Sequence, residues 1–307
     1  MREADTRPMS ADAAVTVVIP TLNRPQLCEL AIRSALSQCD ADCRVLISEN
    51  GSDDRYADDY LRLFASLPPQ ARVIRQPHRL SVEAHFAFVI SQVDTACVVM
   101  LADDDVLAPT FVVRALRLAQ QSGAGAVFGP YLLEYKASGR HKVCDHDYTH
   151  RFRFLRASRF LLSRDDAFIY GLFRTDVLQP AMAEFQPLRI FGRRTLIRIA
   201  YAPLFACLLA APYAHLAGEP VWINTADSTK SEAYLGANNV MKLVELVLGE
   251  WVLAWRFLRL ARRAGGLSLA FGLAPVAVLA GLGYCAGFGL QAVRRLVGVV
   301  RLRGRRV

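Results

Sequence analysis

The stretch that decides the fold is Cys97–Asp105, CVVMLADDD, in which an apolar run leads directly into three carboxylates. A short continuous apolar run is typical of a strand that is buried on both faces of a parallel sheet. Open α/β sheets bind their ligands at the carboxyl ends of such strands. We therefore expect Asp103, Asp104 and Asp105 at a ligand-binding edge, where three adjacent carboxylates require a neighbouring cation.

Two segments nearer the N-terminus follow the same pattern. The run 15–20, VTVVIP, is apolar and β-branched, and it leads into the loop 21–24, TLNR, and a helix that begins at Pro25. The run 44–48, RVLIS, leads into the polar cluster 49–54, ENGSDD, which has turn chemistry. The ends of three strands are thus expected to converge on one crevice.

The rest of the N-terminal half continues to alternate strands with helices. Further helices are expected at about 55–66, 82–92 and 110–122, and further strands at 71–75 and 126–128. This alternation implies parallel strands joined by right-handed crossovers. The predicted fold class is α/β, with a Rossmann-like and mostly parallel sheet.

We expect the chain to divide into three parts. Residues 1–14 are charged and lack an apolar core of signal-peptide length, so we interpret them as a disordered tail that does not direct the chain to secretion. Residues 15–235 form the main domain, in which 134–164 is interpreted as an irregular insertion and 196–217 as a buried helix. Residues 236–307 form a C-terminal helical region.

The C-terminal region carries a long apolar segment. Residues 239–263 predict one long helix with a broad apolar face, and residues 264–293 are 30 positions without a charged side chain. A helix needs roughly 20 residues to cross a bilayer. Because glycines and Pro275 interrupt the segment, three arrangements stay open: a kinked span, a re-entrant hairpin, and a helix pair lying at the membrane interface.

The formal charge of +9 is concentrated in the same region. No Asp, Glu or Lys follows Glu250, whereas ten arginines do: Arg256, Arg259, Arg262, Arg263, Arg294, Arg295, Arg301, Arg303, Arg305 and Arg306. The rest of the chain is therefore close to neutral. A nucleic-acid enzyme would more often spread basic residues around its cleft, so we expect no nucleic-acid partner and instead a membrane surface.

The cysteines indicate a reducing compartment. There are 7 of them, an odd number, and none forms a CxxC pair. Cys39 and Cys43 could ligate a metal only together with a second pair of ligands, and none follows with zinc-site spacing. We expect inert thiols rather than a disulfide framework.

Three motifs, in order, give the chain a resemblance to a known family. The segments VTVVIPTLNRPQLCELAIRSALSQ (15–38), VLISENGSDD (45–54) and VVMLADDDVLAPTFV (98–112) are similar to three motifs of the family 2 glycosyltransferases with the type-A nucleotide-sugar-binding fold. These motifs are a V-x-V-x-I-P-x-x-N-R opening, a D-x-G-S-x-D loop and a D-x-D metal motif. The resemblance covers about residues 15–113 and implies a metal-dependent, inverting transfer of a sugar from a nucleotide-diphosphate donor.

The resemblance also implies roles for individual residues. A nucleotide pocket would be lined by Pro20, Thr21, Asn23, Arg24, Glu49, Asn50, Asp53, Asp103 and Asp104, with Asp103 and Asp105 facing a divalent Mn²⁺ or Mg²⁺ ion. Glu49 and Asn50 stand where many members have two aspartates, which leaves the nucleotide base open between UDP- and dTDP-linked donors. Asn50 can donate and accept hydrogen bonds, so it could still recognise the imide of a pyrimidine base. His85 stands where relatives often have Asn, and the alternative is a core or capping histidine.

An inverting transfer needs a carboxylate that takes the proton of the acceptor hydroxyl. The candidates after the metal motif are Asp165, Asp166, Asp176, Glu184 and Glu219, and none matches the usual acidic motif of the family. We predict Asp166, in SRDDAFIYGLFR, as the catalytic base. The alternative role for Asp166 is that of an N-cap for the element that follows.

Together these features predict a glycosyltransferase at the cytoplasmic face of the inner membrane. Its acceptor would be a glycan or a lipid-linked molecule in cell-envelope polysaccharide synthesis. The missing acidic motif motivates an alternative, a catalytically weak relative that binds nucleotide or serves as a scaffold in polysaccharide assembly. A dinucleotide oxidoreductase is disfavoured, because no GxGxxG motif follows the first strand.

Overall fold

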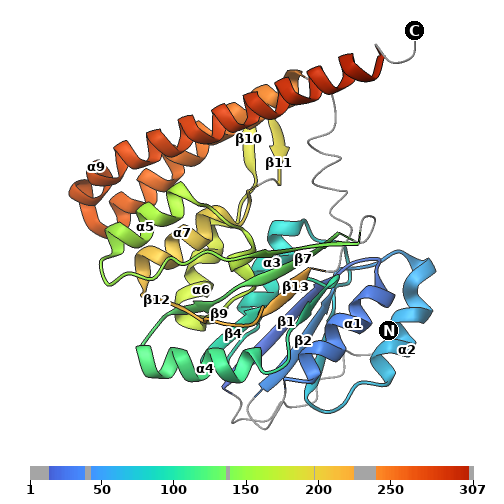
Figure 1. Cartoon of the computed structure of the whole chain (residues 1–307). Helices are drawn as coiled ribbons and strands as arrows, with labels where there is room; N and C mark the ends of the chain where they lie inside the picture. The colour runs from blue at the N-terminus through green and yellow to red at the C-terminus, as the bar shows by residue number, and fades with distance from the viewer. Residues whose placement is uncertain (1–13, 39–42, 136–138, 197, 225–239, 304–307) are drawn as a thin grey trace.

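A computed structural model describes residues 14–38, 43–135, 139–196, 198–224 and 240–303 (Figure 1). The predicted N-terminal tail lies outside the described residues except for Ala14, and so does the predicted domain boundary near residue 235.

The main sheet has seven strands in the order β12-β6-β9-β4-β1-β2-β3. They are β1 (Val15–Thr21), β2 (Cys43–Glu49), β3 (Ala71–Arg75), β4 (Cys97–Met100), β6 (Ala126–Phe128), β9 (Leu172–Arg174) and β12 (Tyr213–His215). Strands β3, β2, β1 and β4 run parallel, with Val15 opposite both Cys43 and Cys97. Every residue of β1, β2 and β4 is buried, as their continuous apolar runs predict. The α/β sheet expected from the sequence is confirmed.

Helices pack on the faces of this sheet (Figure 1). They include α1 (Pro25–Leu36), α2 (Ala57–Ala65), α3 (Val82–Ser91), α4 (Phe111–Ser122) and α6 (Thr175–Ala181). Pro25 occupies the first turn of α1, where its missing N–H leaves no helical hydrogen bond unmade. The Ser81 side chain accepts a hydrogen bond from the backbone N–H of Ala84 and so caps α3.

A second, four-stranded sheet extends the fold beyond the carboxylate motif. Its order is β5-β13-β7-β8, made from β5 (Asp105–Leu107), β13 (Trp222–Asn224), β7 (Tyr131–Tyr135) and β8 (Arg140–Cys144). Strand β13 runs antiparallel to β5, and this register sets Asn224 opposite Asp105. A residue more than a hundred positions away is thereby brought to the end of the carboxylate motif.

Two expectations for the second half of the chain need correction. The described residues of 134–164 are irregular mainly over 145–152, because most of the others belong to the end of β7, strand β8 and the helix α5 (Arg153–Leu162). The helix expected over 196–217 is confined to α7 (Tyr201–Ala210), after which the chain forms the edge strand β12. Pro212 explains this early end, since the residue before a proline is driven to extended geometry and Ala211 has φ −140° and ψ 158°.

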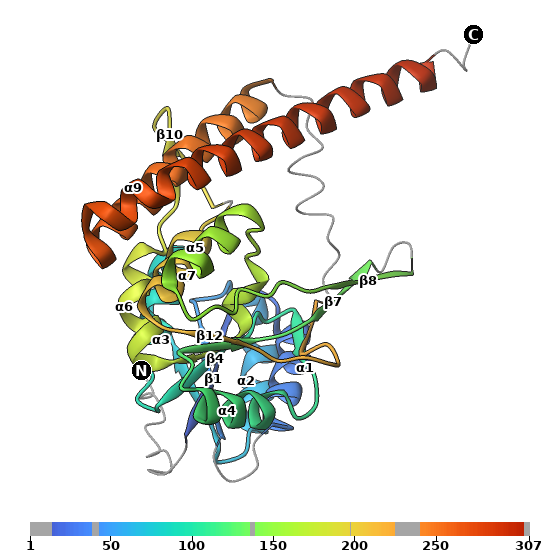
Figure 2. The ribbon, with the colours of Figure 1, turned by 60° about the vertical axis from the view of Figure 1, so that its left-hand side comes forward.

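The C-terminal region is one long helix, α9 (Val240–Arg303), which bends back on itself. Its backbone is non-helical at Gly265 and at Gly266, which has φ 72°, a conformation that glycine adopts without strain. We call residues 240–264 and 267–303 the first and second arms of the C-terminal hairpin. The two arms run antiparallel and side by side (Figures 1 and 2), and a Cβ added at Gly281 would lie 3.8 Å from the Trp251 ring.

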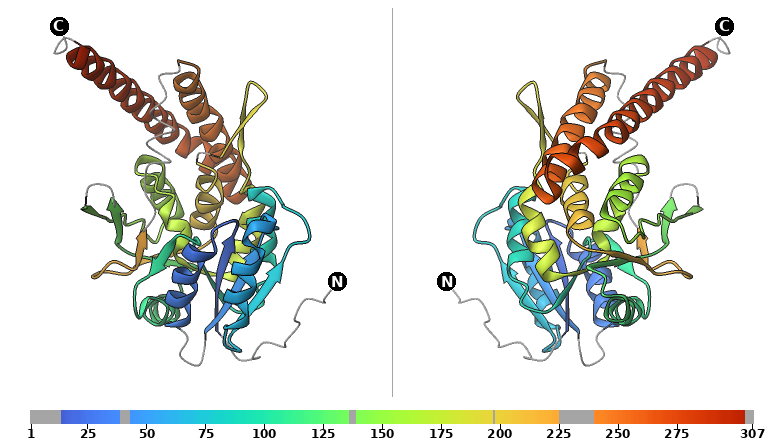
Figure 3. Two further views of the ribbon diagram at one scale, coloured as in Figure 1. Left: turned by 90° about the vertical axis from the view of Figure 1, so that its right-hand side faces the viewer. Right: turned by 90° about the vertical axis from the view of Figure 1, so that its left-hand side faces the viewer.

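The C-terminal hairpin packs on α5 and α7, which lie between it and the sheet (Figures 2 and 3). Phe257 of the first arm contacts Phe205 of α7 and Phe160 of α5, with ring centroids 4.6 and 6.3 Å apart. All three rings are buried. The first arm is therefore part of the hydrophobic core.

A buried group of three charges also joins the hairpin to the main domain. Glu250 of the first arm accepts from Arg164 at 2.7 Å and from Arg198 at 2.9 Å, and all three side chains are almost fully buried. The Arg164 guanidinium lies over the ring of Tyr284 in the second arm, 4.0 Å from its centroid. The backbone N–H of Arg164 donates to the Tyr284 hydroxyl. Arg164 thus contacts both arms.

Replacing Glu250 tests this junction. We expect Glu250→Ala to lower the free energy of unfolding by about 3–5 kcal/mol, because it leaves two buried guanidinium groups without a counter-charge. Urea denaturation followed by tryptophan fluorescence measures the change. The control is Glu29→Ala, which removes the exposed ion pair with Arg33 on α1 and should cost at most about 1 kcal/mol. Equal losses in the two variants would contradict the prediction.

Candidate active site

The carboxyl ends of β1, β2 and β4 meet at one edge of the main sheet. The backbone N–H of Asn50, after β2, donates to the Thr21 carbonyl at 3.0 Å, and that of Leu101, after β4, donates to the Val18 carbonyl at 2.9 Å. These bonds hold the three polar segments that follow the strands in contact with one another. The strand ends that the sequence predicts to converge are thus bonded to one another at this edge.

Arg24 supplies the cation that the carboxylates require. Its Nη2 lies 2.5 Å from Asp103 Oδ1, and its Nη1 lies 2.5 Å from Asp104 Oδ2. The Thr21 hydroxyl donates to the other Asp103 oxygen at 2.8 Å. Burial nevertheless raises the pKa of Asp103 to about 6, with the charge of Arg24 acting in the opposite direction. A buried carboxylate with a raised pKa and a neighbouring cation is typical of functional sites.

Tyr60 of α2 supports this cluster from behind. Its hydroxyl lies 2.7 Å from Thr21 Oγ1. Because the Thr21 hydroxyl donates its hydrogen to Asp103, Tyr60 is the donor in the bond with Thr21. It also accepts from the Arg24 backbone N–H at 3.2 Å. Sequence reasoning missed Tyr60, because nothing in the spacing of an amphipathic helix distinguishes a buried tyrosine with a polar partner from an ordinary core residue.

Asp105 completes the carboxylate motif from the start of β5. It is buried, and its Oδ1 accepts from the Asn224 side-chain amide at 2.9 Å. The carboxylate oxygens of Asp103 and Asp105 are hard donors of the kind that Mg²⁺ and Mn²⁺ take. Over the described residues, no three His, Cys, Asp or Glu side chains gather to hold a metal ion. The donor set therefore fits an ion bound by one or two carboxylates and a ligand's phosphate oxygens, not an all-protein cage.

Asn23 and Asp53 form a second pair at this edge. The Asn23 amide donates to Asp53 Oδ2 and accepts from the Asp53 backbone N–H, both at 2.9 Å. Asn23 has φ 58°, a left-handed conformation that asparagine tolerates better than most residues. Arg79 donates to the other Asp53 oxygen at 2.9 Å. The structure thus joins the loops after β1 and β2 at their exposed rim.

Glu49 and Asn50 are instead turned into the protein. Glu49 accepts from the Ser52 backbone N–H at 2.5 Å and lies 3.4 Å from Arg75 Nε. The Asn50 amide makes reciprocal bonds with the backbone of Leu80, donating at 3.1 Å and accepting at 2.9 Å. Both side chains hold backbone segments in place. Pro20 is likewise buried, within β1.

The segment after α5 brings a further carboxylate to the site. Of two consecutive aspartates, Asp165 is buried, where it accepts from the Ala167 N–H at 3.0 Å and lies 3.3 Å from His146 Nε2. Asp166 is exposed to solvent, does not cap the 3₁₀ turn η2 (Ala167–Tyr170) with its side chain, and so does not fill the alternative role of N-cap. The Asp166 side chain reaches solvent on one side and is surrounded by protein on the others. This partial desolvation, followed by the charge of Asp165, raises the pKa of Asp166.

Tyr170, at the end of η2, connects Asp166 with the carboxylate motif. Burial, followed by the charges of Asp105, Asp166, Asp104 and Asp103, raises the pKa of the Tyr170 phenol well above its ordinary value. Its phenol therefore lies within electrostatic range of all four carboxylates.

The Tyr170 ring also stacks on Trp222, with centroids 4.8 Å apart. Sequence reasoning missed Tyr170, Trp222 and Asn224, which lie in the half of the chain without clear periodicity.

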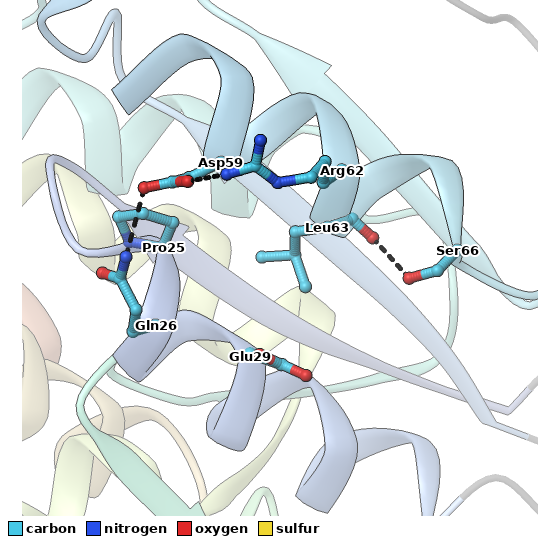
Figure 4. Close-up of a pocket in the computed structure, with 7 residues that line it drawn as sticks. All are labelled: Pro25, Gln26, Glu29, Asp59, Arg62, Leu63 and Ser66. Atoms are coloured by element: carbon cyan, nitrogen blue, oxygen red, sulfur yellow. Dashed lines mark hydrogen bonds and ion pairs between the residues drawn. The ribbon is translucent and has the colours of Figure 1, made fainter. Parts of the chain in front are cut away.

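The cavity drawn in Figure 4 lies apart from this edge, between α1 and α2. It has a volume of about 260 Å³ and is lined by Pro25, Gln26, Glu29, Asp59, Arg62, Leu63 and Ser66. Asp59 in it is bonded to Gln26 at 3.2 Å and to Arg62. It contains none of the predicted site residues, and its polar groups bond mainly to one another.

Comparison with known proteins identifies the family. Residues 16–180, more than half of the chain, match the family described as Glycosyl transferase family 2. A search of curated proteins gives no match.

Solved structures share the fold at low sequence identity. S. aureus TarS 1-349 in complex with UDP has a TM-score of 0.53 at 13% identity, covering 92% of this chain and 91% of that chain. The same protein in complex with UDP-GlcNAc has a TM-score of 0.52 at 15% identity, covering 87% and 79%. The mannosyltransferase PcManGT from Pyrobaculum calidifontis, in complex with GDP-Man and Mn²⁺, has a TM-score of 0.53 at 14% identity, covering 98% and 84%.

His85 gives a pH-dependent prediction for the β2 side of this edge. It is buried in α3 with its Nε2 2.8 Å from the Ser48 hydroxyl, and burial lowers its pKa to about 4. The unfolded chain then binds more protons than the folded one between pH 6.5 and 4, so stability is lost as the pH falls through this window. We expect a slope of up to about 1.4 kcal/mol per pH unit from this group in urea unfolding between pH 7 and 4.

His85→Gln should flatten that slope, because it removes the group that titrates on unfolding. The control is His78→Gln, since His78 is exposed and should leave the slope as it is in the unmodified chain. Identical pH profiles for the unmodified chain and His85→Gln would exclude His85 as the source.

Proposed function

Because the chain belongs to glycosyl transferase family 2, we propose that it transfers a sugar from a UDP- or dTDP-linked donor to a glycan or lipid-linked acceptor, with inversion at the transferred carbon. The observation that carries this proposal is the contact of Arg24 with Asp103 and Asp104 at the carboxyl ends of the strands. It gathers cationic and anionic groups where open α/β sheets bind ligands.

The nucleotide-diphosphate would lie along this edge. Arg24 is about one-third exposed, and its planar guanidinium can turn from the carboxylates to pair bidentately with phosphate oxygens. Asp103 and Asp105 would hold a divalent Mn²⁺ or Mg²⁺ ion, which when bound offsets the negative charge of the diphosphate leaving group. Related folds support this assignment, since one neighbour was solved with UDP and another with GDP-Man and Mn²⁺.

The remaining pocket residues would shape the nucleoside side. Asn23 and Asp53 stand at the exposed rim, where Asp53 can reach a ribose hydroxyl. Thr21 orients Asp103, while the buried Pro20, Glu49 and Asn50 would form the floor of the pocket. Asn50 can hydrogen-bond to a nucleotide base only if its bonds with the Leu80 backbone break. We therefore expect these floor residues to select the base mainly by the shape of the pocket.

Asp166 would act as the general base. The acceptor hydroxyl oxygen forms a bond to the anomeric carbon, the bond from that carbon to the diphosphate oxygen breaks, and the hydroxyl proton passes to the Asp166 carboxylate. A raised pKa makes this carboxylate a stronger base than an ordinary aspartate. The charges of Asp166 and of the carboxylate motif both act on the Tyr170 phenol, which supports a place for Asp166 near the motif.

The C-terminal hairpin supports a location at the cytoplasmic face of the inner membrane, in cell-envelope polysaccharide synthesis. Among the described residues, the segment Val244–Gly287, which includes the bend at Gly265 and Gly266, has the length and apolar composition of a membrane helix. The arginines that follow Glu250 would add attraction to anionic lipid of about 1 kcal/mol for each residue near the surface.

Calorimetric titration tests the donor site. We expect UDP or dTDP to bind in the presence of Mn²⁺, and binding to be lost in EDTA and in Asp105→Ala, because one metal ligand is then missing. The control is Asp58→Ala, an exposed carboxylate on α2, which should bind as the unmodified chain does. Preference for GDP would overturn the pyrimidine assignment, and nucleotide binding without sugar turnover would favour the alternative of a catalytically weak scaffold protein.

Steady-state kinetics test the base once a donor is known. Asp166→Asn should lower kcat by roughly 10²- to 10⁴-fold and leave nucleotide affinity unchanged, because only proton transfer is impaired. Asp176→Asn is the matched control, since Asp176 is an exposed carboxylate paired with Arg174. Equal rates for Asp166→Asn and the unmodified enzyme would exclude Asp166 as the base.

A further inference from the structure

We propose that the C-terminal hairpin lies in the plane of an anionic bilayer, with both arms on one leaflet, and does not cross it. This inference rests on the membrane association proposed above and specifies its geometry. Length and hydropathy alone do not decide the question, because Val244–Gly287 would also suffice for a crossing. The way the two arms pack decides it.

One side of the hairpin is buried against the main domain. Leu253 and Phe257 of the first arm, and Leu273 and Ala277 of the second, are buried. In the second arm, a Cβ added at Gly272 would lie 3.2 Å from the Phe154 ring of α5. A helix that crossed the bilayer would be surrounded by lipid and would have to leave these contacts.

The charges under the hairpin also oppose a crossing. Glu250 lies between Arg164 and Arg198, and Tyr284 of the second arm covers Arg164. Pulling either arm into the hydrocarbon would expose this group or carry Glu250 into lipid, and a charge there costs several kcal/mol. The apolar segment 264–293 is therefore held against the protein over its described part.

The opposite side of the hairpin is apolar and open. Its large exposed side chains are Trp255 (70% exposed), Phe271 (72%), Leu279 (64%), Leu267 (57%), Leu282 (52%) and Val278 (43%). They come from both arms of the hairpin. Exposed large apolar side chains gathered on one element indicate an interaction surface. An amphipathic helix with tryptophan and phenylalanine on one face lies in the interface plane of a membrane.

Charge complementarity selects an anionic bilayer as the occupant of this face. Arg256, Arg259 and Arg263 all lie within 4.0 Å of a single carboxylate, Glu184, so the end of the first arm stays net positive. An in-plane hairpin keeps these arginines and those after Val293 on the same leaflet. A single crossing would put one of the two clusters on the other side, against the tendency of positive residues to stay inside.

This orientation brings the leaflet close to the segment that carries the proposed base. The backbone N–H of Arg164 donates to the Tyr284 hydroxyl of the second arm, and Asp166 follows two positions later. The second arm, a helix about 10–12 Å across, then separates this segment from the leaflet. A lipid-linked acceptor could then present its hydroxyl at Asp166 while its chain stays in the bilayer.

Vesicle flotation with the full chain tests whether this face binds lipid. We expect binding to phosphatidylcholine vesicles that contain phosphatidylglycerol and much weaker binding to phosphatidylcholine alone. The double change Trp255→Ser and Phe271→Ser should weaken binding by at least about tenfold, since it removes apolar side chains that the membrane would bury. Val143→Ser, on β8 and 60% exposed, is the matched control and should bind as the unmodified chain does. No binding, or equal losses in both variants, would overturn the proposal.

Depth-dependent quenching of tryptophan fluorescence distinguishes a hairpin that lies in the membrane plane from one that crosses the bilayer. In a Trp251→Phe, Trp255→Phe background, Phe271→Trp and Leu282→Trp each place one indole on the second arm. On a crossing helix, 11 residues correspond to about 16 Å of depth, so lipids brominated at different positions would quench the two differently. We expect equal quenching by shallow bromines, and unequal depth profiles would overturn the in-plane arrangement. Nucleotide titration of the same variants reports separately on the donor site, so the two proposals fail independently.

Discussion

The burial of Asp103 at the end of β4 is the constraint on which the candidate site depends. A carboxylate at this position costs free energy unless charge and hydrogen bonds compensate it, and Arg24 and Thr21 supply both from the neighbouring strand end. Tyr60 holds Thr21 in turn. Three strand ends are thereby locked into one arrangement whose groups, a guanidinium and clustered carboxylates, are those that recognise a diphosphate and its cation.

The second half of the protein depends on another buried charge. Glu250 draws Arg164 and Arg198 together beneath the C-terminal hairpin, and Phe257 fills the space between α5 and α7. Since Arg164 lies two positions before Asp166, the packing of the hairpin and the position of the proposed base belong to one structural unit. The proposed membrane anchor and the proposed acceptor side of the site are thus physically continuous.

Local periodicity predicted the parts of the fold that carry the motifs. The continuous apolar runs of β1, β2 and β4 give strands within one or two residues of their observed bounds, and Pro25 marks the start of α1. Prediction failed where context overrides pattern. The apolar residues 196–217 suit a helix, yet Pro212 ends it and the remainder pairs with β6 as an edge strand. β9 is another case, since its three residues are a strand only between β4 and β6.

The sequence by itself determined that this chain builds a mostly parallel sheet of glycosyl transferase family 2 with acidic and basic residues at its strand ends, because apolar runs and the polar motifs that follow them are local features of the chain. Only the tertiary structure decided that Asp165 is buried while Asp166 is exposed, that Asn224 pairs with Asp105, and that the apolar C-terminal segment folds back onto the domain. Those features arise from contacts between residues far apart in the chain, which no local pattern encodes.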